Sequence, residues 1–176
     1  QLGHVHFIGI GGAGMSAVAR LMLQAGMTVS GSDRVEGAAL ESLRQLGATI
    51  YTPQAAQNIT GAQTVVISTA IREDNPELAA ARASGLLVLH RSEALAATMR
   101  DSKVIAVAGT HGKTTTSSMI SVMMSSLQLS PSFAVGSTIA GFGSNAHLGA
   151  AGPESWFVAE ADESDGSFVR YRPEIA

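Results

Sequence analysis

The sequence predicts an α/β protein built on parallel sheets, and three observations support this. Short apolar, β-branched runs alternate with segments of helical periodicity along the 176 residues. A glycine-rich turn follows two of these runs, at residues 9–14 and 109–112. A polar junction at residues 100–102 separates the two series of units. We therefore expect one domain over residues 1–100, followed over 101–176 by the first part of a second, partial domain.

The first series predicts five strands, at residues 4–8, 27–30, 48–51, 63–68 and 86–89. Helices are expected between them, beginning after the first glycine turn, at Ala38, at Pro76 and at Ser92. Gly47 stands where a glycine commonly ends a helix, and Pro76 is suited to a first helical position. Ser92 is expected to cap the last helix, with Glu93 in its first turn.

The second series predicts a strand at 103–108, a helix from Lys113 to about Leu127 and a strand at 156–159. Residues 129–149 are rich in Ser, Gly and Ala, so we expect only a short strand at 133–135 and then loop. Another strand begins at residues 173–175.

Composition excludes several classes of protein. The chain has 11 basic and 14 acidic residues, which argues against a nucleic-acid surface. It has no cysteine, which removes disulfides and thiolate metal sites and favours a reducing, cytoplasmic setting. There is no apolar stretch of membrane-spanning length, and the start of the chain reads as trimmed and not as a signal peptide. Oligomeric state is not indicated.

The first glycine turn satisfies G-x-G-x-x-G from Gly9 to Gly14, between a strand and a helix. Glycines allow a diphosphate to approach the backbone, and Asp33 at the end of the next strand can accept from ribose hydroxyls. This pattern predicts a Rossmann-like nucleotide-binding domain. NAD is the default nucleotide for such a motif, and the segment 30–33 would suit a 2′-hydroxyl. A turn needed only for helix–sheet packing is the alternative.

The second glycine turn, Gly109 to Thr115, resembles a phosphate-binding loop. Lys113 can contact the β and γ phosphates of ATP, and the Thr114 hydroxyl can bind Mg²⁺. The loop is shorter than the standard motif because Val107 stands where its first glycine would fall. The alternatives are a threonine that caps a helix, a solvated Lys113, and a His111 that is an ordinary surface residue.

Acidic residues follow the strand at 156–159, at Glu160, Asp162, Glu163 and Asp165. A carboxylate at a strand's carboxyl end, beside a phosphate loop, is what Mg²⁺ bound to ATP requires. A solvated acidic loop is the alternative. Position alone does not choose among the four acids.

Two glycine turns about 100 residues apart suggest one nucleotide carried within a substrate and ATP as the energy source. A dehydrogenase-type or other non-catalytic nucleotide-binding module and a phosphoryl-transfer kinase remain alternatives.

Five segments together resemble the Mur ligases, in order and over essentially the whole chain. They are GIGGAGMS at 9–16, SGSD at 30–33, GTHGKTTT at 109–116, NAHLG at 145–149 and AEADESD at 159–165. The resemblance implies that the second domain is a P-loop-type α/β ATP-binding domain whose remainder, with a third domain, lies beyond Ala176.

The resemblance also implies roles for individual residues. The UDP part of the substrate would be bound by Gly11, Gly12, Ala13, Gly14, Met15, Ser16, Asp33, Ser68, Thr69 and, more loosely, His147. ATP would be bound by Gly109, Thr110, His111, Gly112, Lys113, Thr114 and Thr115. Thr114 and Glu160 would bind Mg²⁺, and these two with Lys113 would be the catalytic residues.

The activity that the resemblance implies is ATP-dependent joining of L-alanine to the carboxylate of UDP-N-acetylmuramate through an acyl phosphate, in bacterial peptidoglycan precursor synthesis. A ligase that recycles murein tripeptide onto UDP-N-acetylmuramate is the alternative within the family. That relative usually has Tyr where this chain has Ser164, which favours L-alanine as the amine. We expect the 176 residues alone to be inactive.

Overall fold

The computed structural model describes residues 2–161 and 171–176. The chain divides into two compact units, Gln1–Ala94 and Leu95–Ala176. This division falls six residues before the predicted boundary. The assignment of the UDP-substrate site to one part and the ATP site to the other stays a prediction.

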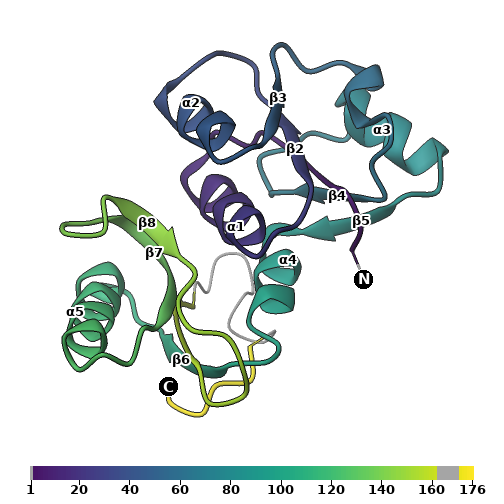
Figure 1. Ribbon diagram of the computed structural model, residues 1–176. Helices are drawn as coiled ribbons and strands as arrows, with labels where there is room; N and C mark the ends of the chain where they lie inside the picture. Colours follow the sequence, from purple (N-terminus) through teal and green to yellow (C-terminus); the bar gives the residue numbers. More distant parts are fainter. Residues whose placement is uncertain (1, 162–170) are drawn as a thin grey trace. The chain divides into compact units, whose positions relative to one another are not determined.

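The first unit contains a five-stranded parallel sheet in the order β3-β2-β1-β4-β5 (Figure 1). Its strands are β1 (Val5–Ile8), β2 (Val29–Ser32), β3 (Thr49–Tyr51), β4 (Thr64–Ile67) and β5 (Leu87–His90). The order reverses direction between β1 and β4, which is where ligands bind in open α/β sheets. The predicted α/β, Rossmann-like fold class is confirmed.

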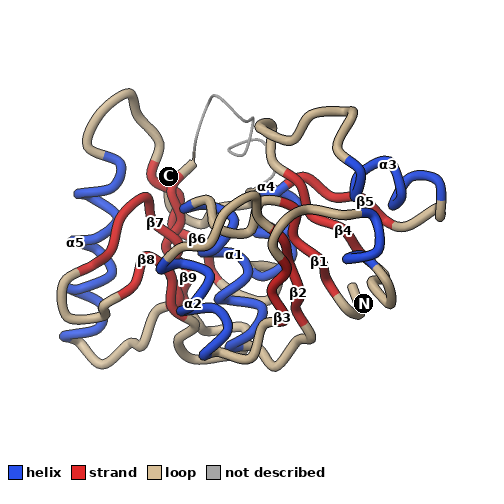
Figure 2. Tube along the Cα trace, turned by 90° about the horizontal axis from the view of Figure 1, so that it is seen from above, coloured by secondary structure: helices blue, strands red, loops and turns tan. Residues whose placement is uncertain are grey.

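Helices connect these strands and cover both faces of the sheet, and one more helix, α4, follows the last strand. They are α1 (Ala13–Gln24), α2 (Ala38–Gln45), α3 (Pro76–Ala83), α4 (Arg91–Thr98, which continues into the second unit) and a short 3₁₀ helix, η1 (Ala56–Ile59). Figure 2 shows α1 and α2 on one side of the strands and α3 on the other. Asn75 caps α3, accepting from the backbone N–H groups of Glu77 and Leu78 at 2.9 and 3.2 Å.

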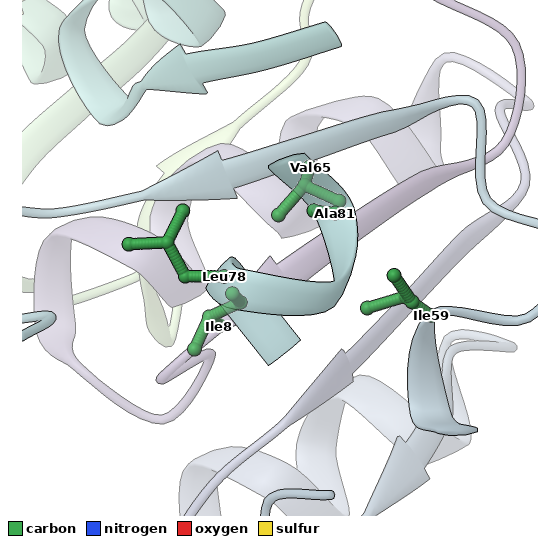
Figure 3. Packing of buried hydrophobic residues seen from close by; sticks show 5 residues of the cluster. All are labelled: Ile8, Ile59, Val65, Leu78 and Ala81. Carbon is green, nitrogen blue, oxygen red and sulfur yellow. The ribbon is translucent and has the colours of Figure 1, made fainter. Parts of the chain in front are cut away.

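The face of the sheet under α3 has an apolar part and a polar part. Ile8, Ile59, Val65, Leu78 and Ala81 form one buried apolar cluster there (Figure 3). Side chains alternate between faces along a strand, so His6 of β1 and Ser30 and Ser32 of β2 lie on the same face as Ile8. These three polar side chains are buried.

The second unit contains a four-stranded sheet in the order β6-β9-β7-β8. Its elements are β6 (Lys103–Val107), α5 (Lys113–Ser126), β7 (Ser132–Ile139), β8 (Ser144–His147) and β9 (Trp156–Glu160). Strands β6, β9 and β7 are parallel, whereas β8 pairs antiparallel with β7. Ile175 forms an isolated parallel bridge with Ile105 of β6.

The core of this unit lies between α5 and the sheet. Ile105, Phe133, Val135, Ile139 and Val158 are its buried members. Ile120 and Met124, four residues apart on one face of α5, pack against them.

Two local predictions were wrong. The segment after Val135, predicted as loop, instead extends β7 to Ile139 and turns back through β8. Helix α4 begins at Arg91, one residue before the predicted Ser92 cap, and the Glu93 carboxylate accepts from the His90 N–H at 2.7 Å. In the described part of the chain, no helix has both the length and the apolar character needed to cross a membrane.

Candidate functional site

The first glycine turn joins β1 to α1 at the carboxyl edge of the first sheet. Gly9 has a φ of +77°, a conformation that side-chain-bearing residues rarely adopt. The N–H groups of Gly9 and Ile10 both donate to the Ser32 carbonyl, at 2.8 and 2.9 Å. A glycine, Gly12, also stands at the N-cap of α1, so no cap side chain occupies the N–H groups of the first turn. Such N–H groups are suited to binding a phosphate.

Asp33 holds the turn through backbone hydrogen bonds. Its Oδ2 accepts from the Gly11 N–H at 2.8 Å, and its Oδ1 accepts from the Arg34 N–H at 2.7 Å. A Cβ added at Gly11 would lie only 2.7 Å from Oδ2, so glycine is required for this close approach. Each carboxylate oxygen keeps a second lone pair that could accept from a ligand hydroxyl.

The serines before Asp33 do not face a ligand. Ser30 and Ser32 are 1% and 0% exposed, and both hydroxyls form hydrogen bonds inside the unit. The suggestion that the segment 30–33 as a whole suits a ribose is therefore wrong for these two residues, because the β2 pleat turns them into the face beneath α3.

Ser68 and Thr69 follow β4 at the same edge of the sheet. The Ser68 carbonyl accepts from the Ile71 N–H at 3.1 Å, which closes a turn. The Ile71 side chain lies 3.2 Å from the position a Cβ would take on Gly9. The turn after β4 therefore packs against the first glycine turn.

Arg91, at the start of α4, is a residue of this site that the sequence analysis missed. A Cβ on Gly14 would lie 1.8 Å from Arg91 Nη1 and 2.9 Å from its Cζ. The absence of a side chain at Gly14 thus makes room for a guanidinium over the first turn of α1. Its position in the sequence could have identified it. Arg91 directly follows β5, and the carboxyl ends of parallel strands lie at one edge of the sheet.

The second glycine turn joins β6 to α5. Gly109 and Gly112 have φ values of +139° and +80°, and Gly112 is the N-cap of α5. Lys113 Nζ donates to the Gly109 carbonyl at 2.7 Å, so the ammonium group lies across the loop. Thr110, His111, Gly112 and Thr115 are exposed, and Lys113 and Thr114 are half-buried.

Thr114 and Glu160 meet beside Gly136 of β7. A Cβ on Gly136 would lie 2.9 Å from Thr114 Oγ1 and 3.2 Å from Glu160 Oε2. Glu160 Oε1 also accepts from the Gly136 N–H at 2.7 Å. Gly136, which the sequence analysis missed, therefore lets a hydroxyl and a carboxylate from two other elements approach the same point.

This pair fits Mg²⁺, which usually takes one or two protein oxygens and completes its shell with phosphate and water. Residues 2–161 and 171–176 contain no group of three or more His, Asp or Glu side chains placed to hold a metal. Asp162, Glu163 and Asp165, predicted as possible metal ligands, and Ser164 lie outside the described residues.

His147 belongs to β8 of the second unit, unlike the other predicted UDP-substrate residues. Its ring centroid lies 5.8 Å from that of Phe133 and 5.4 Å from that of Phe142. Its neighbour Asn145 is half-buried on the same strand.

Known proteins resemble this chain over its whole length. UDP-N-acetylmuramate–L-alanine ligases from Renibacterium salmoninarum and Paenarthrobacter aurescens are 63% and 57% identical to it over 176 residues. The chain spans only 37% and 38% of the length of these relatives.

Solved structures of ligases named for UDP-N-acetylmuramate also resemble this chain. The UDP-N-acetylmuramate:L-alanyl-γ-D-glutamyl-meso-diaminopimelate ligase of Neisseria meningitidis has a TM-score of 0.89 at 32% identity, over all of this chain and 60% of that one. The UDP-N-acetylmuramate–alanine ligase of Thermotoga maritima has a TM-score of 0.86 at 34% identity, over 97% of this chain and 39% of that one. The model of the Mur ligase family catalytic domain matches residues 4–103. The chain therefore belongs to the Mur ligase family.

Proposed function

We propose that the protein containing this chain joins L-alanine to the carboxylate of UDP-N-acetylmuramate at the expense of ATP. The relatives at 51–63% identity over 172–176 residues that are named for this reaction support the choice of substrates. The observation that carries the proposal is the approach of Thr114 and Glu160 to Gly136. It supports the proposal because a hydroxyl and a carboxylate of the kind that Mg²⁺ binds lie together beside the glycine turn that contains Lys113.

The first glycine turn would bind the diphosphate of the UDP substrate. The open N–H groups at the start of α1 would donate to phosphate oxygens, and the cation of Arg91 lies against the same turn. Asp33 would keep the turn in shape and accept from a ligand hydroxyl with a remaining lone pair. Ser68 and Thr69 would line the same edge, and His147 remains the loosest assignment.

The second glycine turn would bind the phosphates of ATP. The N–H groups at the start of α5 and Lys113 Nζ would donate to phosphate oxygens and orient the terminal phosphate. Thr114 and Glu160 would hold Mg²⁺, which when bound neutralises charge on the phosphates. The muramate carboxylate would attack the γ phosphate and release ADP, and the alanine amine would then displace phosphate from the acyl phosphate.

Phosphate release by the full-length protein tests this proposal. With UDP-N-acetylmuramate, L-alanine, ATP and Mg²⁺, we expect phosphate and ADP in equal amounts. We expect no phosphate release when either UDP-N-acetylmuramate or L-alanine is omitted. Phosphate release without an amine would indicate a different phosphoryl-transfer reaction, and no release with all four components would contradict the proposal.

A second candidate is the recycling reaction, in which murein tripeptide replaces L-alanine. The similarity to the Neisseria meningitidis structure favours it, since that fold matches this chain with a TM-score of 0.89. Competition between the two amines in the same assay decides between the candidates. We expect L-alanine to give the higher kcat/KM.

A further inference from the structure

A chain of polar side chains crosses the face of the first sheet beneath α3. His6 and Ser30 are paired neighbours on β1 and β2, and Glu77 reaches them from α3. The side chains of His6 and Glu77 are fully buried, and Ser30 is 1% exposed. His4, at the outer end of the chain, is half-buried. The candidate reaction uses none of these four residues.

The contacts run in series from a backbone carbonyl to the carboxylate. The Gly61 carbonyl lies 3.1 Å from His4 Nδ1, and His4 Nε2 lies 2.8 Å from Ser30 Oγ. The same Ser30 Oγ lies 2.8 Å from His6 Nδ1. His6 Nε2 lies 3.4 Å from Glu77 Oε2.

The two ends of this series fix where protons must be. A carbonyl oxygen can only accept, so His4 Nδ1 carries a proton. Glu77 also accepts from the Ser32 hydroxyl at 2.5 Å, the Asn58 amide at 2.7 Å and the Ala55 N–H at 3.1 Å. Three donors on one carboxyl group favour its ionised form, so His6 Nε2 must carry a proton in order to donate.

Ser30 has a single proton and faces two ring nitrogens. If it donates to His4, it must accept from His6 Nδ1, and His6 then carries both ring protons. If it donates to His6 instead, it must accept from His4 Nε2, and His4 carries both. In either arrangement, every contact is satisfied only when one of the two imidazoles is charged.

We propose that His4 and His6 share one imidazolium proton at neutral pH, and that the Ser30 hydroxyl reverses direction when the proton moves between them. The positive charge offsets the Glu77 carboxylate, which would otherwise be a buried and uncompensated anion. Tyr51 of β3 also lies near His6, with the two ring centroids 6.3 Å apart.

The shared proton bears on the first glycine turn through Ser32. The Ser32 hydroxyl binds Glu77, its carbonyl accepts from Gly9 and Ile10, and the next residue is Asp33. Glu77 is thus a positioning residue for the carboxyl end of β2. Glu77 must be ionised to accept from Ser32 in this way, and the positive charge of the imidazolium balances that ionised carboxylate.

Counting ring protons by NMR tests the proposal directly. The ¹⁵N shifts of Nδ1 and Nε2 distinguish both neutral tautomers from imidazolium, and they can be measured for the unmodified chain. At pH 7 we expect the rings of His4 and His6 to carry three protons in total. A total of two would overturn the proposal, and this measurement requires no variant to fold.

The pH dependence of unfolding provides a second readout. If the folded chain binds one more proton than the unfolded chain, the unfolding constant rises with pH above neutrality, by up to about tenfold per pH unit. The double variant His4→Gln/His6→Gln should lose this rise, whereas His111→Gln, an exposed histidine outside the network, should keep it. The same rise in the double variant and the unmodified chain would contradict the proposal.

Discussion

Asp33 shows how one side chain can shape a turn through backbone hydrogen bonds. Each carboxylate oxygen accepts from a different backbone N–H, of Gly11 and of Arg34. The motif predicted a carboxylate at this position. It could not predict these contacts, because they depend on how closely the end of β2 approaches the turn after β1.

We expect Asp33→Asn to weaken UDP binding. The amide keeps one acceptor oxygen but turns an NH₂ toward the other N–H group, so one hydrogen bond of the turn is lost. A loss of about 1 kcal/mol per hydrogen bond predicts a Kd for UDP raised by roughly five- to tenfold. Calorimetry with UDP measures this, and an unchanged Kd would show that Asp33 does not shape the site. Glu41→Gln, an exposed change on α2, is the control.

Gly136 gives a test of the proposed Mg²⁺ pair. In Gly136→Ala the new Cβ would lie 2.9 Å from Thr114 Oγ1 and 3.2 Å from Glu160 Oε2, so at least one of the two must move. Disturbing metal ligands in this way predicts a Mg²⁺ requirement raised by about 10- to 100-fold in ATP binding.

Gly37→Ala is the matched control for this substitution. Gly37 has an extended φ of −174°, and nothing lies within 4 Å of its added Cβ. An unaltered Mg²⁺ dependence in Gly136→Ala, with the fold retained, would remove Thr114 and Glu160 from the metal site.

Among the elements, α3 is defined by the residues at its start and by its buried face. Asn75 at its start accepts two backbone N–H groups, and Pro76 follows at the first helical position. The sequence predicted this helix from Pro76, because a proline suited to a first helical position is a local signal. It did not predict that α3 carries a buried carboxylate, because Glu77 acquires its partners from three other segments of the chain, β1, β2 and residues 55–58.

Removing the Asn75 cap should destabilise the first unit. We expect Asn75→Ala to lower its free energy of unfolding by about 1 kcal/mol, because two N–H groups of the first turn lose their acceptor. Asn75→Asp keeps the acceptor and should retain most of the stability. Urea denaturation measures both, and equal losses in the two variants would mean that the cap hydrogen bonds contribute little.

The ionisation of Glu77 makes the same element sensitive to acid. Burial raises the pKa of Glu77, but hydrogen bonds from His6, Ser32 and Asn58 outweigh this effect and hold the pKa below its usual value. A carboxyl group whose pKa is lower in the folded state stabilises the fold above its unfolded pKa of about 4.3. This stabilisation is lost as the pH falls below that value.

Glu77→Gln should therefore be less stable than the unmodified chain at pH 7 and should lose less stability between pH 6 and pH 3. Urea midpoints across this pH range measure the difference. Parallel curves for the two proteins would show that Glu77 ionisation does not contribute.

The hairpin of β7 and β8 could not be predicted from local sequence signals. Serine, glycine and alanine dominate this stretch, and residues 136–138 of β7 are exposed, so no alternation of apolar and polar side chains marks the strand. Its pairing comes from tertiary contacts with β9 and from the return strand β8. Gly136 lies within this stretch, which is why its place at the candidate metal site was not predicted.

At the scale of the whole molecule, the repeated strand–turn–helix order predicted the fold class, because each unit carries its own periodicity and glycine turn. It predicted the edges of the sheets where the candidate sites lie. Residues brought there by tertiary approach, such as Arg91 and Gly136, had no local pattern to identify them.

Two sites in two compact units should be separable by substitution. In the full-length protein, we expect Lys113→Ala to abolish ATP-dependent phosphate release, because the loop loses the cation that lies across Gly109. Binding of UDP-N-acetylmuramate should change by less than about twofold, since an undisturbed site costs well under 1 kcal/mol. Lys103→Ala, which removes an ammonium paired with Glu154 in the same unit, is the matched control for both measurements. If Lys113→Ala weakened UDP-substrate binding as much as it reduced turnover, the two glycine turns would have to act as one site.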